Sequence, residues 1–277
     1  MVKFYPSIPD DLRDWCLRQP VFFTASAPLA GQHINCSPKG YPHRSLRFLG
    51  PNRVAYLDAT GSGCETIAHM YENGRLTLMF CSFGPAPRIA RFFCRHGRVV
   101  ELGSAEFDSW RGVFGGSGGG GDDDDDDVLV GARAVIVLDV FKAQTSCGFG
   151  VPLVDKETDG KEATTTTTTT TAAGPRDTLA RWATKMLEKD ALDGYRRDNN
   201  WRSLDGLPGL RAGRRARGQW VAVEDGGARA RRLARQWDAV LVGVLLAGVL
   251  LVALVVGGVV RVEMGPMAGG RLRSPLQ

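Results

Sequence analysis

The stretch from Arg53 to Cys81 constrains the fold of this chain more than any other, because it joins two strand patterns through a glycine-containing loop and a short helix. Its parts in chain order are a strand at 53–58, a polar loop at 60–63, a helix at 64–73 and a strand at 76–81. The loop runs into a helix N-terminus, where the first N–H groups lack helical partners and the macrodipole is positive. The unit therefore predicts an anion site between two strands.

Hydroxyl side chains make this loop a candidate phosphate site. Thr60, Ser62 and Thr66 supply donors, and the glycines at 61 and 63 allow close approach of the backbone. A capped turn without a ligand uses the same residue types, so both interpretations stay open. A Walker loop is excluded because no Gly-Lys-Ser/Thr follows, and the dinucleotide fingerprint is excluded because its third glycine position is Thr66.

Strand patterns surround this unit and predict a mainly β fold. Runs rich in β-branched and aromatic residues lie at 21–26, 33–37, 47–49, 88–94, 97–102 and 132–141. Helices are predicted from Ile8, at 105–110 and at 176–195. In the last of these, an apolar stripe of Leu179, Trp182, Met186 and Leu187 predicts core packing. Many short strands with peripheral helices indicate a closed or nearly closed β-barrel.

Low-complexity runs divide the chain, because such segments bury too little apolar surface to offset the entropy of ordering them. The predicted domains are a barrel at 1–154 with a Gly/Ser/Asp insertion at 115–127, a linker at 155–175, a helical extension at 176–210, a basic disordered linker at 211–238 and an apolar helix at 239–260.

The apolar run at 239–260 is long enough to cross a bilayer. As a helix it spans about 33 Å, against a hydrocarbon core of about 30 Å. The alternatives are a buried helix or a mis-assigned extension of the reading frame. Arginines precede the run, which favours a single-pass C-terminal membrane anchor with the N-terminal domain in the cytoplasm.

Charge and cysteine usage exclude several classes of protein. The segment 211–238 carries eight arginines against three acidic residues, so it accounts for the whole net charge of +5. The folded part is near neutral, and no nucleic-acid partner is expected. The six cysteines form no C-x-x-C pair, and the four histidines show no metal-ligand spacing, so no metal site is predicted. The N-terminus lacks the pattern of a signal peptide, which predicts reduced thiols.

Four motifs in this order resemble the pyridoxamine 5′-phosphate oxidase-like family. They are Asn35-Cys-Ser-Pro-Lys-Gly40, Leu49-Gly-Pro-Asn-Arg-Val-Ala-Tyr-Leu-Asp58, Thr60-Gly-Ser-Gly-Cys-Glu-Thr-Ile-Ala-His69 and Gln144-Thr-Ser-Cys-Gly-Phe149. The resemblance implies a six-stranded FMN-binding split barrel. It also implies a homodimer with FMN in a cleft at the subunit interface. It covers most of residues 1–154 and says nothing of the apolar C-terminal run.

The same resemblance assigns cofactor-binding residues position by position. These are Ser37, Lys39, Thr60, Ser62, Thr66, Arg88, Gln144 and Ser146. Arg88, or its neighbour Arg91, would add a phosphate cation, and a solvated charge at the barrel rim is the alternative for both. Cys147 is expected to be a small buried residue rather than a reactive thiol. His69 is expected to be packed or surface-exposed rather than catalytic, and no catalytic residue is assigned.

The resemblance implies an FMN-dependent oxidoreductase that acts on a small-molecule substrate. A departure weakens this expectation, since Gly63, Cys64 and Glu65 stand where better-studied members carry a basic pair. The alternative is a non-catalytic flavin-binding module or a degenerate split barrel.

Overall fold

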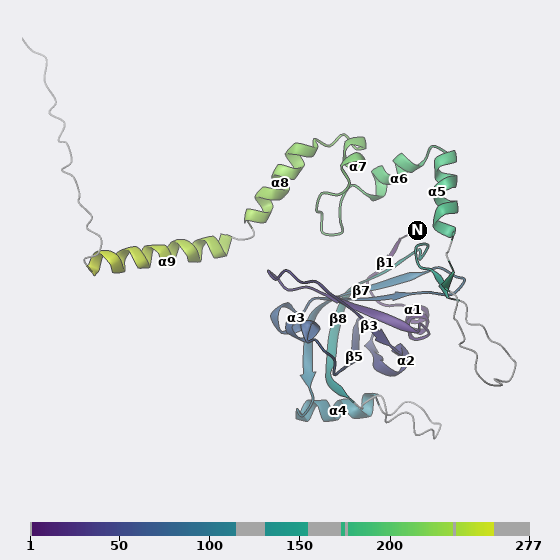
Figure 1. Cartoon of the computed structure of the whole chain (residues 1–277), viewed down its shortest axis with the longest axis horizontal. Helices are drawn as coiled ribbons and strands as arrows, with labels where there is room; N and C mark the ends of the chain where they lie inside the picture. Colours follow the sequence, from purple (N-terminus) through teal and green to yellow (C-terminus); the bar gives the residue numbers. More distant parts are fainter. Residues whose placement is uncertain (1, 115–130, 155–172, 175–176, 235–236, 258–277) are drawn as a thin grey trace, which may run out of the picture. The chain divides into compact units, whose positions relative to one another are not determined.

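The computed structural model describes residues 2–114, 131–154, 173–174, 177–234 and 237–257. The chain divides into two compact units, residues 1–182 and residues 183–277 (Figure 1). The predicted insertion at 115–127, most of the linker at 155–175 and the last three residues of the run at 239–260 lie outside the described residues.

An eight-stranded antiparallel sheet forms the first unit, in the order β3-β2-β6-β7-β8-β5-β4, with β1 also paired to β8. Its strands are β1 (Lys3–Tyr5), β2 (Val21–Ser26), β3 (Asn35–Gly40), β4 (Leu46–Gly50), β5 (Arg53–Ala59), β6 (Leu76–Cys81), β7 (Ile89–Glu101) and β8 (Ala132–Ser146). A two-stranded ribbon joins β9 (Leu153–Val154) to β10 (Ala173–Gly174). The sheet thus has two strands more than the six that the family resemblance implied.

The sheet curls strongly around one core. In the sheet order β2 and β5 are four strands apart, which in a flat sheet is about 19 Å. The rings of Phe22 on β2 and Tyr56 on β5 nevertheless lie 5.8 Å apart, edge to face. Leu46 of the far edge strand belongs to the same buried cluster. The fold is therefore mainly β and forms a split barrel, as predicted, with β3 and β4 as the two edges of the split.

A second cluster covers the outer face of the two strands β5 and β8. Val135 and Val137 point away from the barrel core and pack with Phe107 and Phe114 of α4 (Ala105–Phe114). Because β8 is buried on both faces here, its sequence is almost continuously apolar rather than alternating. This packing explains the strong strand pattern that the sequence shows at 132–141.

Three helices complete the barrel: α1 (Asp10–Leu17), α2 (Pro42–Ser45) and α3 (Glu65–Asn73). Leu12 and Cys16 of α1 and Met70 of α3 belong to the barrel core. α3 ends at Gly74, which adopts a left-handed conformation (φ 62°) and packs its backbone against Gly97 of β7. A side chain at either glycine would push the helix away from the sheet.

Two predicted boundaries differ from the structure. The runs at 88–94 and 97–102 form one continuous strand, β7, with a register irregularity at the residues between them. The helix predicted at 176–195 is two helices, α5 (Thr178–Glu188) and α6 (Leu192–Asn199), separated by Asp190 with a positive φ of 49°. No residue of α5 is buried, so the prediction of a core stripe there was wrong.

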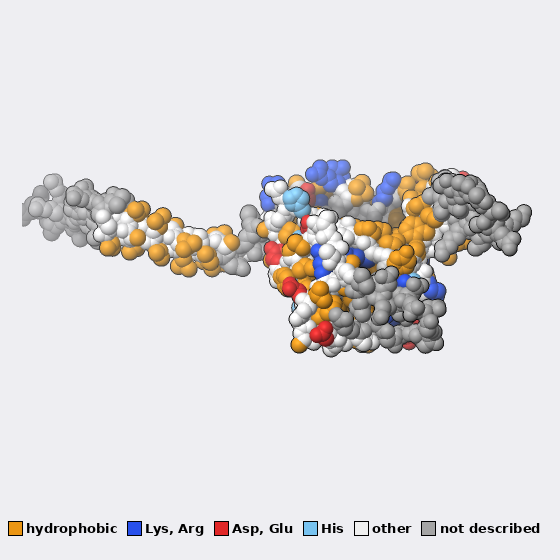
Figure 2. Space-filling model, turned by 60° about the horizontal axis from the view of Figure 1, so that its bottom comes forward, with side chains coloured by type: hydrophobic (Ala, Val, Ile, Leu, Met, Phe, Trp, Pro, Cys, Tyr) orange, Lys and Arg blue, Asp and Glu red, His pale blue; other side chains and the backbone are white. Residues whose placement is uncertain are grey.

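The second unit contains helices where a disordered basic linker was predicted. α7 (Arg211–Ala216) and α8 (Val221–Ala234) occupy that stretch, and Arg214 is buried with an ion pair to Asp225 at 2.6 Å. Close backbone contact between α6 and α7 requires glycine at 213, where a Cβ atom would lie 2.7 Å from the Arg196 carbonyl oxygen. The apolar helix α9 (Trp237–Val256) has exposed apolar side chains along its length (Figure 2).

Candidate functional site

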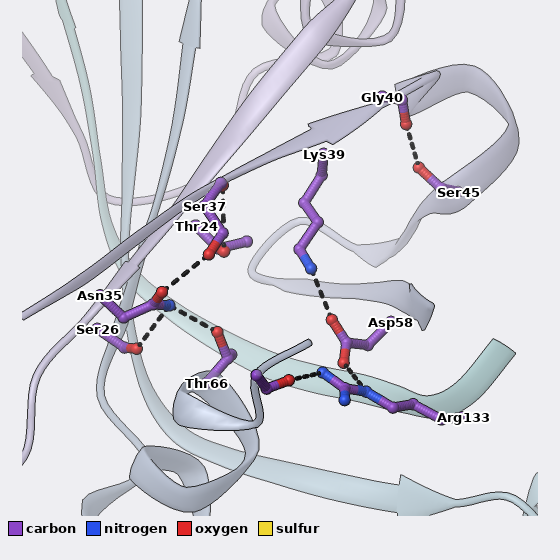
Figure 3. A network of polar contacts seen from close by, with 11 residues as sticks. Thr24, Ser26, Asn35, Ser37, Lys39, Gly40, Ser45, Asp58, Thr66 and Arg133 are labelled. Atoms are coloured by element: carbon purple, nitrogen blue, oxygen red, sulfur yellow. Dashed lines mark hydrogen bonds and ion pairs between the residues drawn. The ribbon is translucent and has the colours of Figure 1, made fainter. Parts of the chain in front are cut away.

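A polar pocket of about 340 Å³ lies where the N-terminal part of α3 meets the edge strand β3 and the end of β5. Figure 3 shows most of its side chains. The lining residues are Asn35, Ser37 and Lys39 of β3, Asp58 and Ala59 of β5, Gly61, Ser62 and Gly63 of the loop, Glu65 and Thr66 of α3, and Arg133 of β8. Nearly all of these present polar atoms, so the pocket suits a polar or anionic group rather than an aromatic ring.

A buried carboxylate between two cations is the electrostatic centre of the pocket. Asp58 is 1% exposed and accepts from Lys39 Nζ at 2.7 Å and from Arg133 Nε at 2.8 Å. The two cations are 21% and 25% exposed, so both reach toward solvent through the pocket. A buried carboxylate needs such partners because an unpaired charge in the interior is very costly. The three groups together carry a charge of +1, which favours an anionic ligand, and Glu65 at the rim of the pocket opposes it.

Arg133 also fixes the loop that precedes α3. Its Nη2 atom donates to the Gly63 carbonyl oxygen at 2.7 Å, so one guanidinium joins the β5 carboxylate to the loop backbone. A register irregularity between Asp58 and Ala59 lies opposite Arg133 in the β5–β8 pair. Bulges of this kind redirect side chains next to functional sites.

Tyr56, two residues before Asp58 on β5, is fully buried in the barrel core next to the pocket. Burial raises the pKa of this phenol well above its usual value, and the nearby negative charge of Asp58 raises the pKa further. Lys39 Nζ lies 5.9 Å from the Tyr56 ring centre. The barrel interior next to Asp58 is therefore a medium of low polarity, in which charge interactions are stronger than in water.

A chain of hydrogen bonds orients the hydroxyls on the other side of the pocket. Ser37 Oγ donates to Asn35 Oδ1 at 2.8 Å, and Asn35 Nδ2 donates to Thr66 Oγ1 at 2.8 Å (Figure 3). Because Thr66 accepts from Asn35, its own hydroxyl hydrogen remains available to a ligand in the pocket. Ser26 Oγ lies 2.9 Å from Nδ1 of the buried His69, behind the same asparagine. His69 is thus packed, which is one of the two alternatives expected for it, and it supports the pocket from behind.

The N-terminus of α3 adds backbone donors beside these hydroxyls. Its N-cap residue, Cys64, makes no side-chain capping bond. The carboxylate of Glu65 instead lies against Gly63, at the rim of the pocket. An anion at this helix end would gain from the helix dipole and would compete with Glu65 for the same position.

The eight predicted cofactor residues fall into two groups. Ser37, Lys39, Ser62 and Thr66 line the polar pocket. Thr60 adjoins it and is held through its backbone N–H, which donates to the Gly131 carbonyl oxygen at 2.7 Å. The remaining three residues do not line this pocket; they are Arg88, Gln144 and Ser146.

The second group lies along the ends of β7 and β8. Arg88 stacks its guanidinium 5.1 Å from the Trp15 ring centre. Gln144 and Ser146 are part of β8, which continues five residues beyond the predicted end at Phe141. The neighbouring Arg91 donates to Ser146 Oγ at 3.4 Å. Cys147 is exposed, so the expectation of a buried thiol there was wrong.

Sequence reasoning missed Asp58 and Arg133, which form the charged centre of the pocket. Each is a charged residue next to an apolar run of its strand, residues 54–57 in β5 and 134–138 in β8, and that position was the available signal. Among the described residues no group of three or more His, Cys, Asp and Glu side chains is arranged to hold a metal ion.

Comparisons with known proteins give one strong sequence similarity. The protein ustO of Aspergillus flavus, described as a pyridoxamine 5′-phosphate oxidase family protein, is 48% identical over 221 residues, which are 80% of this chain and 83% of the relative. No protein-family model matches. Two similar solved structures are HupZ of Group A Streptococcus (19% identity, TM-score 0.37, 50% of this chain and 99% of that chain) and a FAD-binding protein of Mesorhizobium loti (13% identity, TM-score 0.31, 53% of this chain and 99% of that chain).

Proposed function

This chain belongs to the pyridoxamine 5′-phosphate oxidase family, and from that premise we propose that it is an FMN-dependent oxidoreductase. The observation that carries the proposal is the polar pocket, in which Lys39 and Arg133 flank a buried carboxylate beside three hydroxyls and a helix N-terminus. These are the groups that a phosphate monoester requires.

The pocket fits the phosphate end of the cofactor. Its volume of about 340 Å³ is near the lower end of the range of small-molecule sites, about 300–1,000 Å³. Its polar walls suit the phosphate and the hydroxyls of the ribityl chain, whereas an isoalloxazine ring needs a flat apolar surface. Arg133 supplies the guanidinium that the loop itself lacks, and so stands in for the basic pair that is missing at Gly63, Cys64 and Glu65.

When bound, the flavin would accept a hydride from an amine or alcohol carbon of a small-molecule substrate and pass electrons to O₂ or another acceptor. The protein residues bind and orient. Lys39 and Arg133 bind the phosphate, Ser62 and Thr66 donate hydrogen bonds to it, and Asn35 holds the Thr66 hydroxyl in a donating orientation.

In a homodimer, the predicted cofactor residues outside the polar pocket, Gln144 and Ser146 among them, could contact the flavin of the partner subunit. Gln144 and Ser146 share the outer face of the sheet with Arg91, and the apolar side chains of Phe4 and Phe141 are 49% and 46% exposed on β1 and β8. Exposed aromatic residues on a sheet face are typical of protein interfaces. A second copy packed on this face would shield them. We therefore propose a dimer that completes the flavin site, with sedimentation of the purified protein as its test.

We propose in addition that α9 anchors the protein in a membrane with the barrel on the cytoplasmic side. Residues Ala239–Val256 have a mean hydropathy of 3.2 and are not buried within the molecule. The helix is about 30 Å long, which matches a bilayer core. Arg229 and Arg231 precede it on α8. Recovery of the full chain in the soluble fraction after alkaline extraction of membranes would refute the anchor.

The cofactor proposal is tested by titrating the purified chain with FMN and following the quenching of flavin fluorescence. The double variant Lys39→Ala/Ser62→Ala should weaken FMN affinity at least tenfold, because it removes one cation and one donor from the phosphate. Equal affinity in the variant and the parent would refute this phosphate site. Anaerobic bleaching of the bound flavin by a donor substrate would support an enzyme, and a flavin inert to all donors would support the non-catalytic alternative.

A further inference from the structure

A second cavity lies outside the polar pocket and outside the barrel core. It has a volume of about 1190 Å³ and sits between the C-terminal end of α1, the turn after β3 and the loop after β6. Its walls are mainly apolar and include Leu17, Phe83 and Pro85. The volume is slightly above the range of about 300–1,000 Å³ of small-molecule sites, and apolar walls with a few polar groups are typical of such sites.

Tyr41, at the rim of this cavity, has an unusual backbone conformation. Its φ is 51° and its ψ is 61°, a left-handed conformation that is strained for a residue with a side chain. The backbone is pinned in place: its N–H donates to the Pro20 carbonyl oxygen, and its own carbonyl accepts from the N–H groups of Arg44 and Ser45. Strain held in this way concentrates at functional sites.

The pinned backbone presents an aromatic ring to solvent. Tyr41 is 68% exposed and makes an edge-to-face contact with His43, their ring centres 6.2 Å apart. An exposed ring on a fixed backbone is a stacking surface for a planar molecule, and it loses little entropy when a ligand binds.

The charge of the cavity indicates the type of ligand. Arg18 and His43 are among the lining residues, and none of the described residues that line the cavity is an aspartate or a glutamate. Arg18 is exposed at the C-terminal end of α1, where its guanidinium can pair with a carboxylate. Only Gly40 separates Tyr41 from Lys39, which lines the polar pocket on the same chain segment.

We infer that this cavity binds a planar aromatic carboxylate, stacked on Tyr41 and paired with Arg18, as the substrate class of the enzyme. The inference deepens the proposed function and rests on it for the role of the ligand as a substrate. The binding site itself stands on the cavity, the fixed backbone of Tyr41 and the cationic side chain of Arg18 among the described lining residues.

The test uses the full chain and 2-naphthoate as the probe, with affinity measured by equilibrium dialysis. Tyr41→Gly removes the ring and relieves the strained φ, so the variant should fold and bind the probe about tenfold more weakly. Gly84→Phe fills the cavity: a Cβ atom there meets only Ser82 Oγ at 3.7 Å, so the backbone is not strained. It should abolish specific binding. Gly150→Phe is the matched control, because a side chain there points into open space.

The test compares a charged with a neutral probe, and it compares each variant with the parent. Arg18→Gln should reduce the preference for 2-naphthoate over the neutral 2-naphthamide by about two- to fivefold. All variants keep the same C-terminal helix, so binding of the probe to that helix cancels between them. Unchanged 2-naphthoate affinity in both Tyr41→Gly and Gly84→Phe would overturn the inference.

FMN titration of the same variants separates this inference from the proposed function. Both variants should bind FMN as the parent does. A chain that binds FMN but shows no effect of either variant on the probe keeps the proposed function and refutes the aromatic site. A chain that does not bind FMN but loses the probe in both variants keeps the aromatic site and refutes the proposed function.

Discussion

Replacing Asp58 by asparagine should make the protein less stable and yet increase its affinity for phosphate. Asp58 is 1% exposed and forms ion pairs of 2.7 and 2.8 Å with Lys39 and Arg133. Asparagine keeps the shape and removes the negative charge. Both cations are partly solvated, so the loss is smaller than for a fully buried pair, and we expect a cost of about 1–3 kcal/mol in the free energy of unfolding.

The gain in affinity follows from the distances in the pocket. An anion that contacts Lys39 Nζ from the pocket side would lie about 5 Å from the Asp58 carboxylate, since each N–H···O contact is about 2.8 Å long. Two unit charges at that separation interact by about 1–3 kcal/mol for an effective dielectric constant between about 80 and 20. Removing the repulsion should tighten phosphate binding about five- to 150-fold.

Two measurements and one control test this prediction. Urea unfolding followed by tryptophan fluorescence gives the stability, and the midpoint should fall by about 1 M. Calorimetric titration with inorganic phosphate gives the affinity without requiring a flavin. Asp139→Asn is the matched control, because Asp139 is half-exposed on β8 and lies 3.7 Å from Arg53. It should change stability by less than about 0.5 kcal/mol. Weaker phosphate binding in Asp58→Asn would show that the carboxylate organises the cations rather than competing with the ligand.

Three further predictions concern other residues. Glu65→Gln should tighten FMN binding about two- to fivefold, since it removes an exposed carboxylate from the rim of the pocket; weaker binding in a fluorescence titration would contradict this. Gly97→Ala should lower stability by about 1–3 kcal/mol in urea unfolding, because its Cβ atom would meet Met70 and would lie 3.0 Å from a Leu138 methyl; an unchanged midpoint would disprove the packing. Native protein should show three fast thiols with a disulfide reagent and six after denaturation, and the reaction of the fast thiols should speed up as pH rises. The fast cysteines are 36, 64 and 147, and the buried ones are 16, 81 and 94, whose pKa values are raised by burial. A fourth fast thiol in the native state would argue against that burial.

The strand patterns were predictable because burial on the inner face of the barrel imposes a local period on the sequence. The limits of β2 and β6 agree with the predicted runs, and the loop and helix between β5 and β6 lie where the sequence indicated. The break between α5 and α6 was not predictable, because the composition around Asp190 is helical on both sides.

The pocket was predictable only in part. Lys39 and Ser37 stand out in a polar motif, but strict alternation along β8 would direct Arg133 to the outer face with Val135 and Val137. The irregularity in the β5–β8 register is a product of strand pairing and leaves no local mark in the sequence. The ion pair between Arg133 and Asp58 joins residues that are far apart in the chain, so it could be recognised only once the fold was known.

The split between the edge strands β3 and β4 affects how easily the barrel opens locally. Among the described strands β3 pairs with β2 alone, and the Lys39–Asp58 ion pair connects β3 to β5 across the split. A ligand in the polar pocket would contact β3 on one side of the split and β5 on the other, and would hold the two strands together. The strand that carries Asn35, Ser37 and Lys39 should then open more readily when the pocket is empty, and its amide hydrogens should exchange more slowly when a ligand is bound.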